Sequence, residues 1–185
     1  MSEAQLLFLL AAVFALSFLA VWLIEGAKFY RRFRGKRLIV CPENRKPAAV
    51  EVAAASGAFS TLLAPELHLR NCSRWPEKQD CGQYCLSQIE AAPEDCLVTN
   101  IVRRWYLAKH CAYCSRPFFH LEWHEHRPAL RDPAGKTVQW NEVPAEKLPE
   151  VLATHAPVCW HCHVAESFRR AHGELVTDRP VRRAS

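Results

Sequence analysis

Glycine and methionine are scarce in this sequence, with six glycines and one methionine, Met1, in 185 residues. Phosphate-binding and dinucleotide-binding loops need several glycines close together, and no such loop and no G-x-S-x-G nucleophile motif is present. Acidic residues near the expected helix starts need no acid–base role, because negative charge is stabilising there. The sequence therefore predicts a protein that is not an enzyme, with a redox role as the main exception.

The region after residue 37 has almost no net charge. Six of the 24 Lys and Arg residues lie between Lys28 and Arg37, which leaves 18 of them against 17 Asp and Glu residues in 38–185. A nucleic-acid-binding protein would carry its positive excess on the folded region. The charge distribution therefore predicts no nucleic-acid partner.

Charged residues are absent from Leu6–Ile24, a run of 19 mostly apolar residues. A helix of this length reaches roughly the 30 Å of a bilayer core, and Trp22 lies where an interfacial aromatic belongs. A cleaved signal peptide would carry its basic residues before the apolar run, whereas here they follow it. The sequence predicts one uncleaved transmembrane helix at residues 5–25, followed by a basic juxtamembrane segment at 26–37.

The basic segment also predicts the orientation of the chain. Segments rich in Lys and Arg stay in the cytoplasm, so we expect residues 26–185 there and the N-terminus outside, in a cell inner membrane. The same positive charges would contact anionic lipid headgroups. Because the cytoplasm keeps thiols reduced, metal ligation is favoured over disulfides for the cysteines.

The remainder predicts a small α+β fold with two subdomains, a cysteine-rich one at 38–108 and a second at 109–176, before a loose tail at 177–185. In the first, the predicted elements are strands over 38–40 and 48–52, a helical stretch over 81–91 and a helix over 93–108. In the second, they are strands over 117–123 and 137–140, with a turn at 132–135 between them, and a helix over 162–171.

Nine cysteines and nine histidines are many for a chain of this length. Two cysteine pairs have the C-x-x-C spacing of metal ligands, in which one turn brings two thiolates to one ion. Two such turns complete the tetrahedral four-thiolate shell that zinc prefers. The predicted ligands of one zinc ion are Cys111, Cys114, Cys159 and Cys162.

The order of these elements resembles a treble-clef zinc finger over residues 109–173. The segment Lys109–Phe118 resembles the zinc knuckle of that group, and a hairpin and a helix that opens at the second cysteine pair follow it. The resemblance is architectural. It implies a structural metal site carried by the same four cysteines.

A second interpretation uses Cys159-Trp160-His161-Cys162-His163, which matches the C-x-x-C-H haem-attachment motif of c-type cytochromes. Cys159 and Cys162 would then bond the haem vinyl groups, and His163 would ligate the iron. Three observations weigh against it: Met1 is the only methionine, haem c is attached outside the cytoplasm, and the other C-x-x-C pair would have no role. A thioredoxin-like dithiol is a third interpretation of either pair.

Four further cysteines, Cys41, Cys72, Cys81 and Cys85, could form a second four-thiolate site for zinc or an iron–sulfur cluster. The spacing of Cys81 and Cys85 predicts that both lie on one face of a helix. Alternatively, several of these are buried reduced thiols, or, outside the cytoplasm, disulfides that include Cys96. We expect Cys96, on the predicted helix over 93–108, to take no part in metal binding.

His120, His124 and His126 share one face of an expected strand. This face is predicted to be solvated, with a metal patch or a distal haem ligand as alternatives. The sequence as a whole predicts a membrane-anchored structural zinc protein that acts as an interaction or assembly module with a protein partner at the cytoplasmic face. The alternative is a membrane-anchored electron carrier with haem c or an iron–sulfur cluster.

Overall fold

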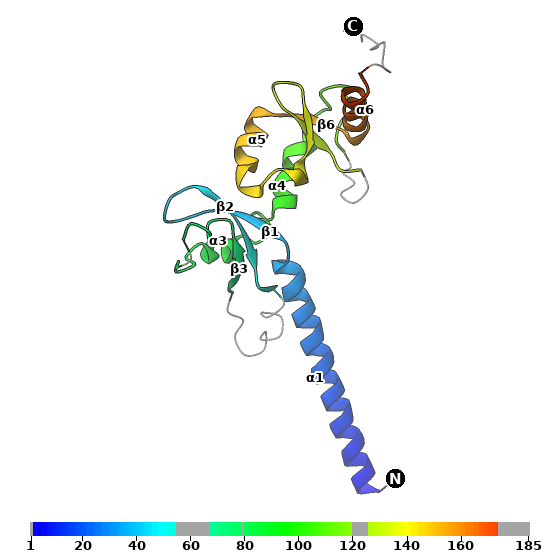
Figure 1. The fold of residues 1–185 in the computed structure, drawn as a ribbon. Coiled ribbons are helices and arrows are strands. Elements are labelled where there is room, and N and C mark those ends of the chain that lie inside the picture. The colour runs from blue at the N-terminus through cyan, green and yellow to red at the C-terminus, as the bar shows by residue number, and fades with distance from the viewer. Residues whose placement is uncertain (1, 55–66, 79, 120–125, 174–185) are drawn as a thin grey trace. The chain divides into compact units, whose positions relative to one another are not determined.

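The computed structural model describes residues 2–54, 67–78, 80–119 and 126–173. The structure is a mixed α+β fold. The chain divides into two compact units, Met1–Val98 and Thr99–Ser185, called unit 1 and unit 2 (Figure 1). Each unit contains a three-stranded antiparallel sheet. The predicted α+β class is therefore confirmed.

Unit 1 begins with helix α1 (Glu3–Phe33). Ser2 and Gln5 exchange side-chain and backbone hydrogen bonds at 3.0 and 3.3 Å, a reciprocal cap that defines the start of the helix. The large apolar side chains of its uncharged run are exposed, and the helix is long and apolar enough to cross a membrane. Its last turns continue past that run and pack Phe29 and Phe33 against the core of unit 1.

Strands β1 (Lys36–Val40) and β2 (Pro47–Val52) form an antiparallel hairpin, and β3 (Leu69–Cys72) pairs with the other edge of β2 (Figure 1). Side chains alternate along the strands. The inward-facing Ile39 and Val50 are 3% and 1% exposed. The hairpin predicted over 38–52 is confirmed.

The predicted helical stretch over 81–91 is wrong in its first half, because helix α3 covers only Leu86–Ala91. Gln83 has a φ of +51°, a left-handed conformation that a right-handed helix cannot contain. Cys81 therefore does not lie one helical turn from Cys85. Gln88 of α3 exchanges two hydrogen bonds with the backbone of Val40, at 2.7 and 3.1 Å, and these attach α3 to the end of β1.

Helix α4 (Val98–Leu107) begins later than the predicted start at Pro93. The carbonyl of Cys96 accepts a hydrogen bond from the amide of Leu38 at 2.8 Å, and Leu97 forms an isolated bridge with Arg37. These backbone contacts with β1 are incompatible with a helix at the same residues. The apolar spacing of the predicted helix remains correct for α4, whose Val102 and Tyr106 are fully buried.

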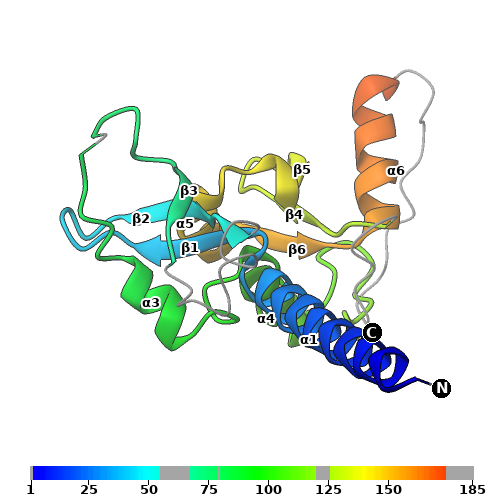
Figure 2. The same ribbon diagram turned by 90° about the horizontal axis from the view of Figure 1, so that it is seen from below.

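In unit 2, strand β4 (Ala129–Arg131) lies between β5 (Thr137–Gln139) and β6 (Ala156–Val158) (Figure 2). The turn between β4 and β5 forms as predicted. The amide of Gly135 donates to the carbonyl of Asp132 at 3.0 Å, and Gly135 has a φ of +87°. Glycine suits this position because it adopts positive φ without a side-chain clash.

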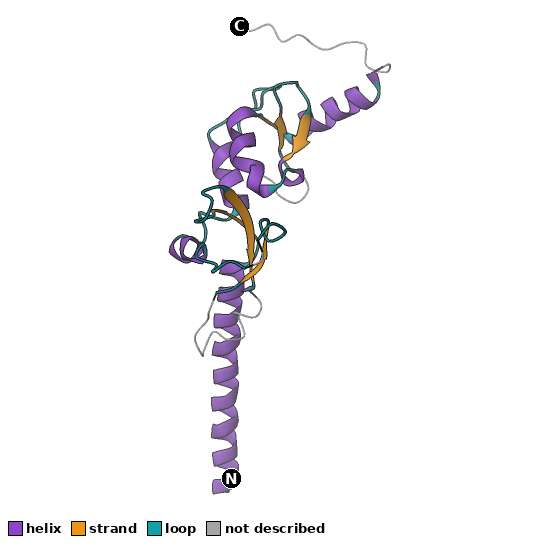
Figure 3. Ribbon diagram, turned by 60° about the vertical axis from the view of Figure 1, so that its left-hand side comes forward, coloured by secondary structure: helices purple, strands orange, loops and turns teal. Residues whose placement is uncertain are grey.

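A proline-containing segment leads from β5 to the last helix. Its elements are two short 3-10 turns, η1 (Trp140–Glu142) and η2 (Ala145–Lys147), and helix α5 (Leu148–Thr154) (Figure 3). Strand β6 and helix α6 (Trp160–Ala171) follow. The helix predicted over 162–171 is confirmed, with a start two residues earlier.

Three other predictions lie wholly or partly outside the described residues. Of the strand predicted over 117–123, residues 117–119 form no strand beyond an isolated bridge between His110 and Pro117, and residues 120–123 are outside that part of the chain. His120, His124 and the tail at 177–185 also lie outside the described residues. His126 is described, and its ring lies 6.1 Å from that of His161 with the planes nearly parallel.

Candidate metal centre

Four thiols from two separate segments of unit 2 converge. The sulfur atoms of Cys111, Cys114, Cys159 and Cys162 all lie within 4.8 Å of one another, and the sulfurs of Cys114 and Cys159 are 3.8 Å apart. A tetrahedral ion with ligand bonds of about 2.3 Å places its sulfurs about 3.8 Å apart. The group could therefore hold one metal ion.

The first pair lies on a tight turn, which we call the unit 2 knuckle (residues 111–116). The amide of Cys111 donates to the carbonyl of Arg116 at 2.9 Å, and the amide of Ser115 donates to the carbonyl of Cys111 at 2.9 Å. Ser115 has a φ of +55°, which closes the turn. This conformation directs the amides of Tyr113 and Cys114 at the sulfur of Cys111. Such donors orient a ligand and stabilise its thiolate.

The second pair lies at the start of helix α6. Cys159 is the residue before the helix, in an extended conformation, and Cys162 lies in its first turn. A helix N-terminus stabilises negative charge, so it favours thiolates at this position. The amide of Cys159 also donates to the sulfur of Cys111 at 3.4 Å, which connects the second pair to the knuckle.

Burial acts to raise the pKa of Cys111, Cys159 and Cys162. For Cys111 the hydrogen bonds from the amides of Cys159, Cys114 and Tyr113 outweigh burial and lower the pKa to about 7. The pKa values of Cys159 and Cys162 are raised, by burial first and also by the negative charge of Cys111. A bound divalent cation would offset this repulsion and allow all four thiols to ionise.

His163 lies next to the group but contacts other residues. Its Nδ1 is 3.0 Å from Oγ1 of Thr137 on β5. Burial lowers the pKa of His163, and Glu142 partly opposes the shift. Haem c would need both Cys159 and Cys162 bonded to a porphyrin, whereas their sulfurs lie against those of the knuckle.

The other four predicted ligands, Cys41, Cys72, Cys81 and Cys85, line one small cavity of unit 1. Cys72 and Cys85 are buried. Burial raises the pKa of Cys85 to about 11, and its neighbours Cys72, Cys81 and Cys41 contribute to the rise. Among the described residues only the unit 2 group has all its ligand atoms within 4.8 Å of one another, so these four sulfurs are spread more widely.

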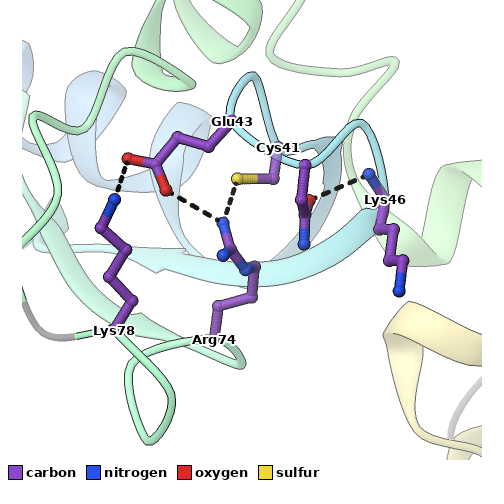
Figure 4. Close-up of polar contacts among 6 residues, drawn as sticks. Cys41, Glu43, Lys46, Arg74 and Lys78 are labelled. Carbon is purple, nitrogen blue, oxygen red and sulfur yellow. Dashed lines mark hydrogen bonds and ion pairs between the residues drawn. The ribbon is translucent and has the colours of Figure 1, made fainter.

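Sequence reasoning missed Arg74. Its guanidinium contacts the sulfur of Cys41 and the carboxylate of Glu43, both in the loop after β1 (Figure 4). Its Nη1 donates to the sulfur of Cys41 at 2.7 Å and to the carboxylate of Glu43 at 3.3 Å. Lys78 pairs with the other carboxylate oxygen at 2.9 Å. Burial acts to raise the pKa of Cys41, but the amides of Glu43 and Asn44 and then Arg74 outweigh it and lower that pKa. No spacing signal connects residues this far apart in the chain.

All nine cysteines lie within the described residues, and none forms a disulfide. Cys96 belongs to neither set, and its sulfur lies 3.7 Å from the carbonyl of Gln88. Fold and site together define a cysteine-rich α+β chain with one four-cysteine group that could hold a metal ion and one helix that could anchor it in a membrane. No family model, no curated protein and no solved structure matches the chain.

Proposed function

We propose that this protein is a membrane-anchored structural zinc protein that acts as an interaction or assembly module at the cytoplasmic face. The observation that carries the proposal is the convergence of Cys111, Cys114, Cys159 and Cys162 within 4.8 Å. Four thiolates fill a tetrahedral shell and leave no open position for a substrate or a water molecule. A closed shell of this kind stabilises a fold and does not catalyse a reaction.

The order of elements around the site supports a treble-clef type of module. The unit 2 knuckle comes first, the hairpin of β4 and β5 follows, and α6 begins at the second cysteine pair. Each pair then supplies two ligands, one pair from a turn and the other from a helix start. Soft thiolates also suit zinc better than magnesium or calcium.

Electron transfer remains the second candidate, because the C-x-x-C-H motif at 159–163 is intact and three of the unit 1 cysteines lie close to Cys85. The sulfurs of Cys159 and Cys162 favour zinc over haem c, since they lie against those of Cys111 and Cys114. An iron–sulfur cluster among Cys41, Cys72, Cys81 and Cys85 is the other form of this candidate.

The membrane part of the proposal rests on how α1 ends. A cleaved signal sequence would be lost from the mature protein. Here the same helix continues from the apolar run into the core of unit 1 through Phe29 and Phe33. Cleavage near residue 25 would separate this packed end from the rest of the helix, so the structure supports a retained anchor. The six basic residues at 28–37 favour a cytoplasmic C-terminal region.

The interaction part of the proposal rests on helix α6. Val164 and Phe168 lie one turn apart on the helix that begins at the metal site, and they are 44% and 52% exposed. Exposed apolar side chains that are neighbours on a helix suit contact with another protein. A structural ion at the start of α6 would hold this surface in place.

The experiment is elemental analysis and an absorption spectrum of the full-length protein, purified from membranes of a host that attaches haem c. The proposal expects a colourless protein with stoichiometric zinc. Cys111→Ser should lose the zinc of unit 2, and the control Cys96→Ser should keep it. A Soret band that survives acid–acetone extraction would overturn the proposal in favour of covalent haem and an electron carrier.

A further inference from the structure

The loop after β1 has the same backbone turn as the unit 2 knuckle. The amide of Cys41 donates to the carbonyl of Lys46 at 2.9 Å, and the amide of Arg45 donates to the carbonyl of Cys41 at 2.8 Å. Arg45 has a φ of +55°, the same value as Ser115. The amides of Glu43 and Asn44, two and three residues after Cys41, donate to its sulfur. Every one of these bonds has its counterpart in residues 111–116.

The two turns differ in the number of thiol ligands that they offer. Asn44 stands where the unit 2 knuckle has its second cysteine, Cys114. The side-chain oxygen of Asn44 accepts a hydrogen bond from the amide of Lys46 at 3.0 Å, so this side chain closes the turn. A metal site built on this turn would take one sulfur from the turn, Cys41, and the others from elsewhere in unit 1.

The other three sulfurs belong to cysteines that line a cavity beside the turn. It has a volume of about 30 Å³ and is lined by Cys41, Cys72, Cys81 and Cys85. One water molecule needs about 10–15 Å³ of such space, so a single ion fits. A four-iron cluster, which adds eight atoms, would need the walls to move apart.

Positive charge at the edge of the cavity suits a four-thiolate ion, because zinc with four thiolates carries a net charge of −2. Arg74 already donates to the sulfur of Cys41, and both Arg74 and Lys78 line the cavity. Donors of this kind hold ligand sulfurs in place in known metal sites. Arg74 can keep this contact when the sulfur also binds an ion.

We propose that Cys41, Cys72, Cys81 and Cys85 bind a second zinc ion, in unit 1, with the turn at 41–46 as its knuckle. Binding requires the four sulfurs to move closer together than they are here. Cys81 and Gln83 lie before the start of α3, so this segment can shift inward without breaking a helix. The site uses none of the ligands of the unit 2 site and does not depend on that site being occupied.

The test is the zinc content of the full-length protein, purified from membranes in mild detergent under reducing conditions. Wild type should contain about two zinc ions per chain, one for each four-thiolate site. Cys81→Ser should lose half of the zinc, and Cys81→His should keep it because imidazole also ligates zinc. Cys96→Ser is the matched control in the same unit and should retain both ions.

Rescue by histidine separates ligation from a packing role, because a histidine at a merely buried position would not restore zinc. If Cys81→Ser failed to fold, Cys41→Ser and Cys41→His would make the same comparison at a half-buried position. The proposal is overturned if wild type contains only one zinc ion per chain and Cys111→Ser is the only variant that loses it. It is also overturned by disulfides among these cysteines, or by visible absorption from iron that Cys81→Ser abolishes.

Discussion

The amide of Cys159 donates a hydrogen bond to the sulfur of Cys111 at 3.4 Å, between residues 48 positions apart in the chain. The amide of Ala112, next to Cys111, donates in turn to the carbonyl of Pro157 on β6 at 2.8 Å. The unit 2 knuckle and the start of α6 are therefore joined through their backbones as well as through their sulfurs. Because of this, loss of an ion at the site would disturb both segments together.

We expect Cys111→Ser and Cys159→Ser to unfold unit 2 to the same degree. Structural zinc contributes on the order of 10 kcal/mol to the folding of small modules, which is comparable to the whole stability of a unit of this size. Hydrogen exchange of the β4 and α6 amides in the full-length protein would measure the effect. Cys96→Ser should leave this protection unchanged. A Cys111→Ser protein that keeps its zinc and its protection would rule out the four-thiolate site.

Arg37→Ala should destabilise unit 1 by about 2–4 kcal/mol. Its fully buried guanidinium donates to the carbonyls of Arg32 and Arg34 at the end of α1. Removing it breaks both of these hydrogen bonds and leaves a cavity behind. The change in the free energy of unfolding would be measured by urea denaturation, monitored through hydrogen exchange of the β1 amides.

The matched control for Arg37 is Arg70→Ala, on β3 of the same unit. Arg70 is 72% exposed and pairs only at the surface with Glu51. Exposed ion pairs contribute little, so we expect a loss below about 1 kcal/mol. Equal losses for the two variants would show that the buried guanidinium does not hold α1 to the sheet.

Gly35→Ala should destabilise unit 1 by about 1–2 kcal/mol or more. Gly35 joins α1 to β1 with a φ of +97°, and a Cβ there would lie 3.2 Å from Cδ1 of Leu97. Gly173→Ala is the control, because nothing lies within 4 Å of the added atom. Thermal unfolding of both variants would test this, and an unchanged midpoint for Gly35→Ala would contradict the strained connection.

A reporter fused after Ser185 should be active only if it works in the cytoplasm. The reason is the cluster of six basic residues that follows the apolar part of α1. An active periplasmic phosphatase fusion would reverse this orientation. It would also make disulfides and covalent haem the preferred interpretations of the cysteines.

Replacing Val164 and Phe168 together by Ser should reduce the size of the detergent-solubilised complex without loss of zinc. The reason is that both side chains are exposed on α6 and neither is one of the sulfur ligands. Phe119→Ser is the control, since Phe119 is 82% exposed but lies outside α6. Sedimentation of the three proteins would make the comparison, and an unchanged complex size in the double variant would exclude α6 as the contact surface.

The sequence alone predicted the features that depend on local pattern. Two short runs, at 38–40 and 48–52 on either side of a Pro-Glu-Asn turn, predicted the hairpin of β1 and β2, and Asp132–Gly135 predicted the turn before β5. The long uncharged run predicted α1. The C-x-x-C spacing predicted that Cys111 and Cys159 would each bring a second sulfur to one group, because a turn of this length forces its two cysteines together.

Only the tertiary structure decided the features that depend on contacts distant in the chain. The hydrogen bond between Leu38 and Cys96 delays the start of α4, against the local signal at Pro93. The left-handed Gln83 separates Cys81 from Cys85, against their helical spacing. Arg74 reaches the sulfur of Cys41 only because β3 folds back beside the hairpin. The spacing of apolar residues shows which segments favour a helix or a strand. The contacts between distant residues stabilise the fold only once these helices and strands have packed together, so local spacing does not reveal them.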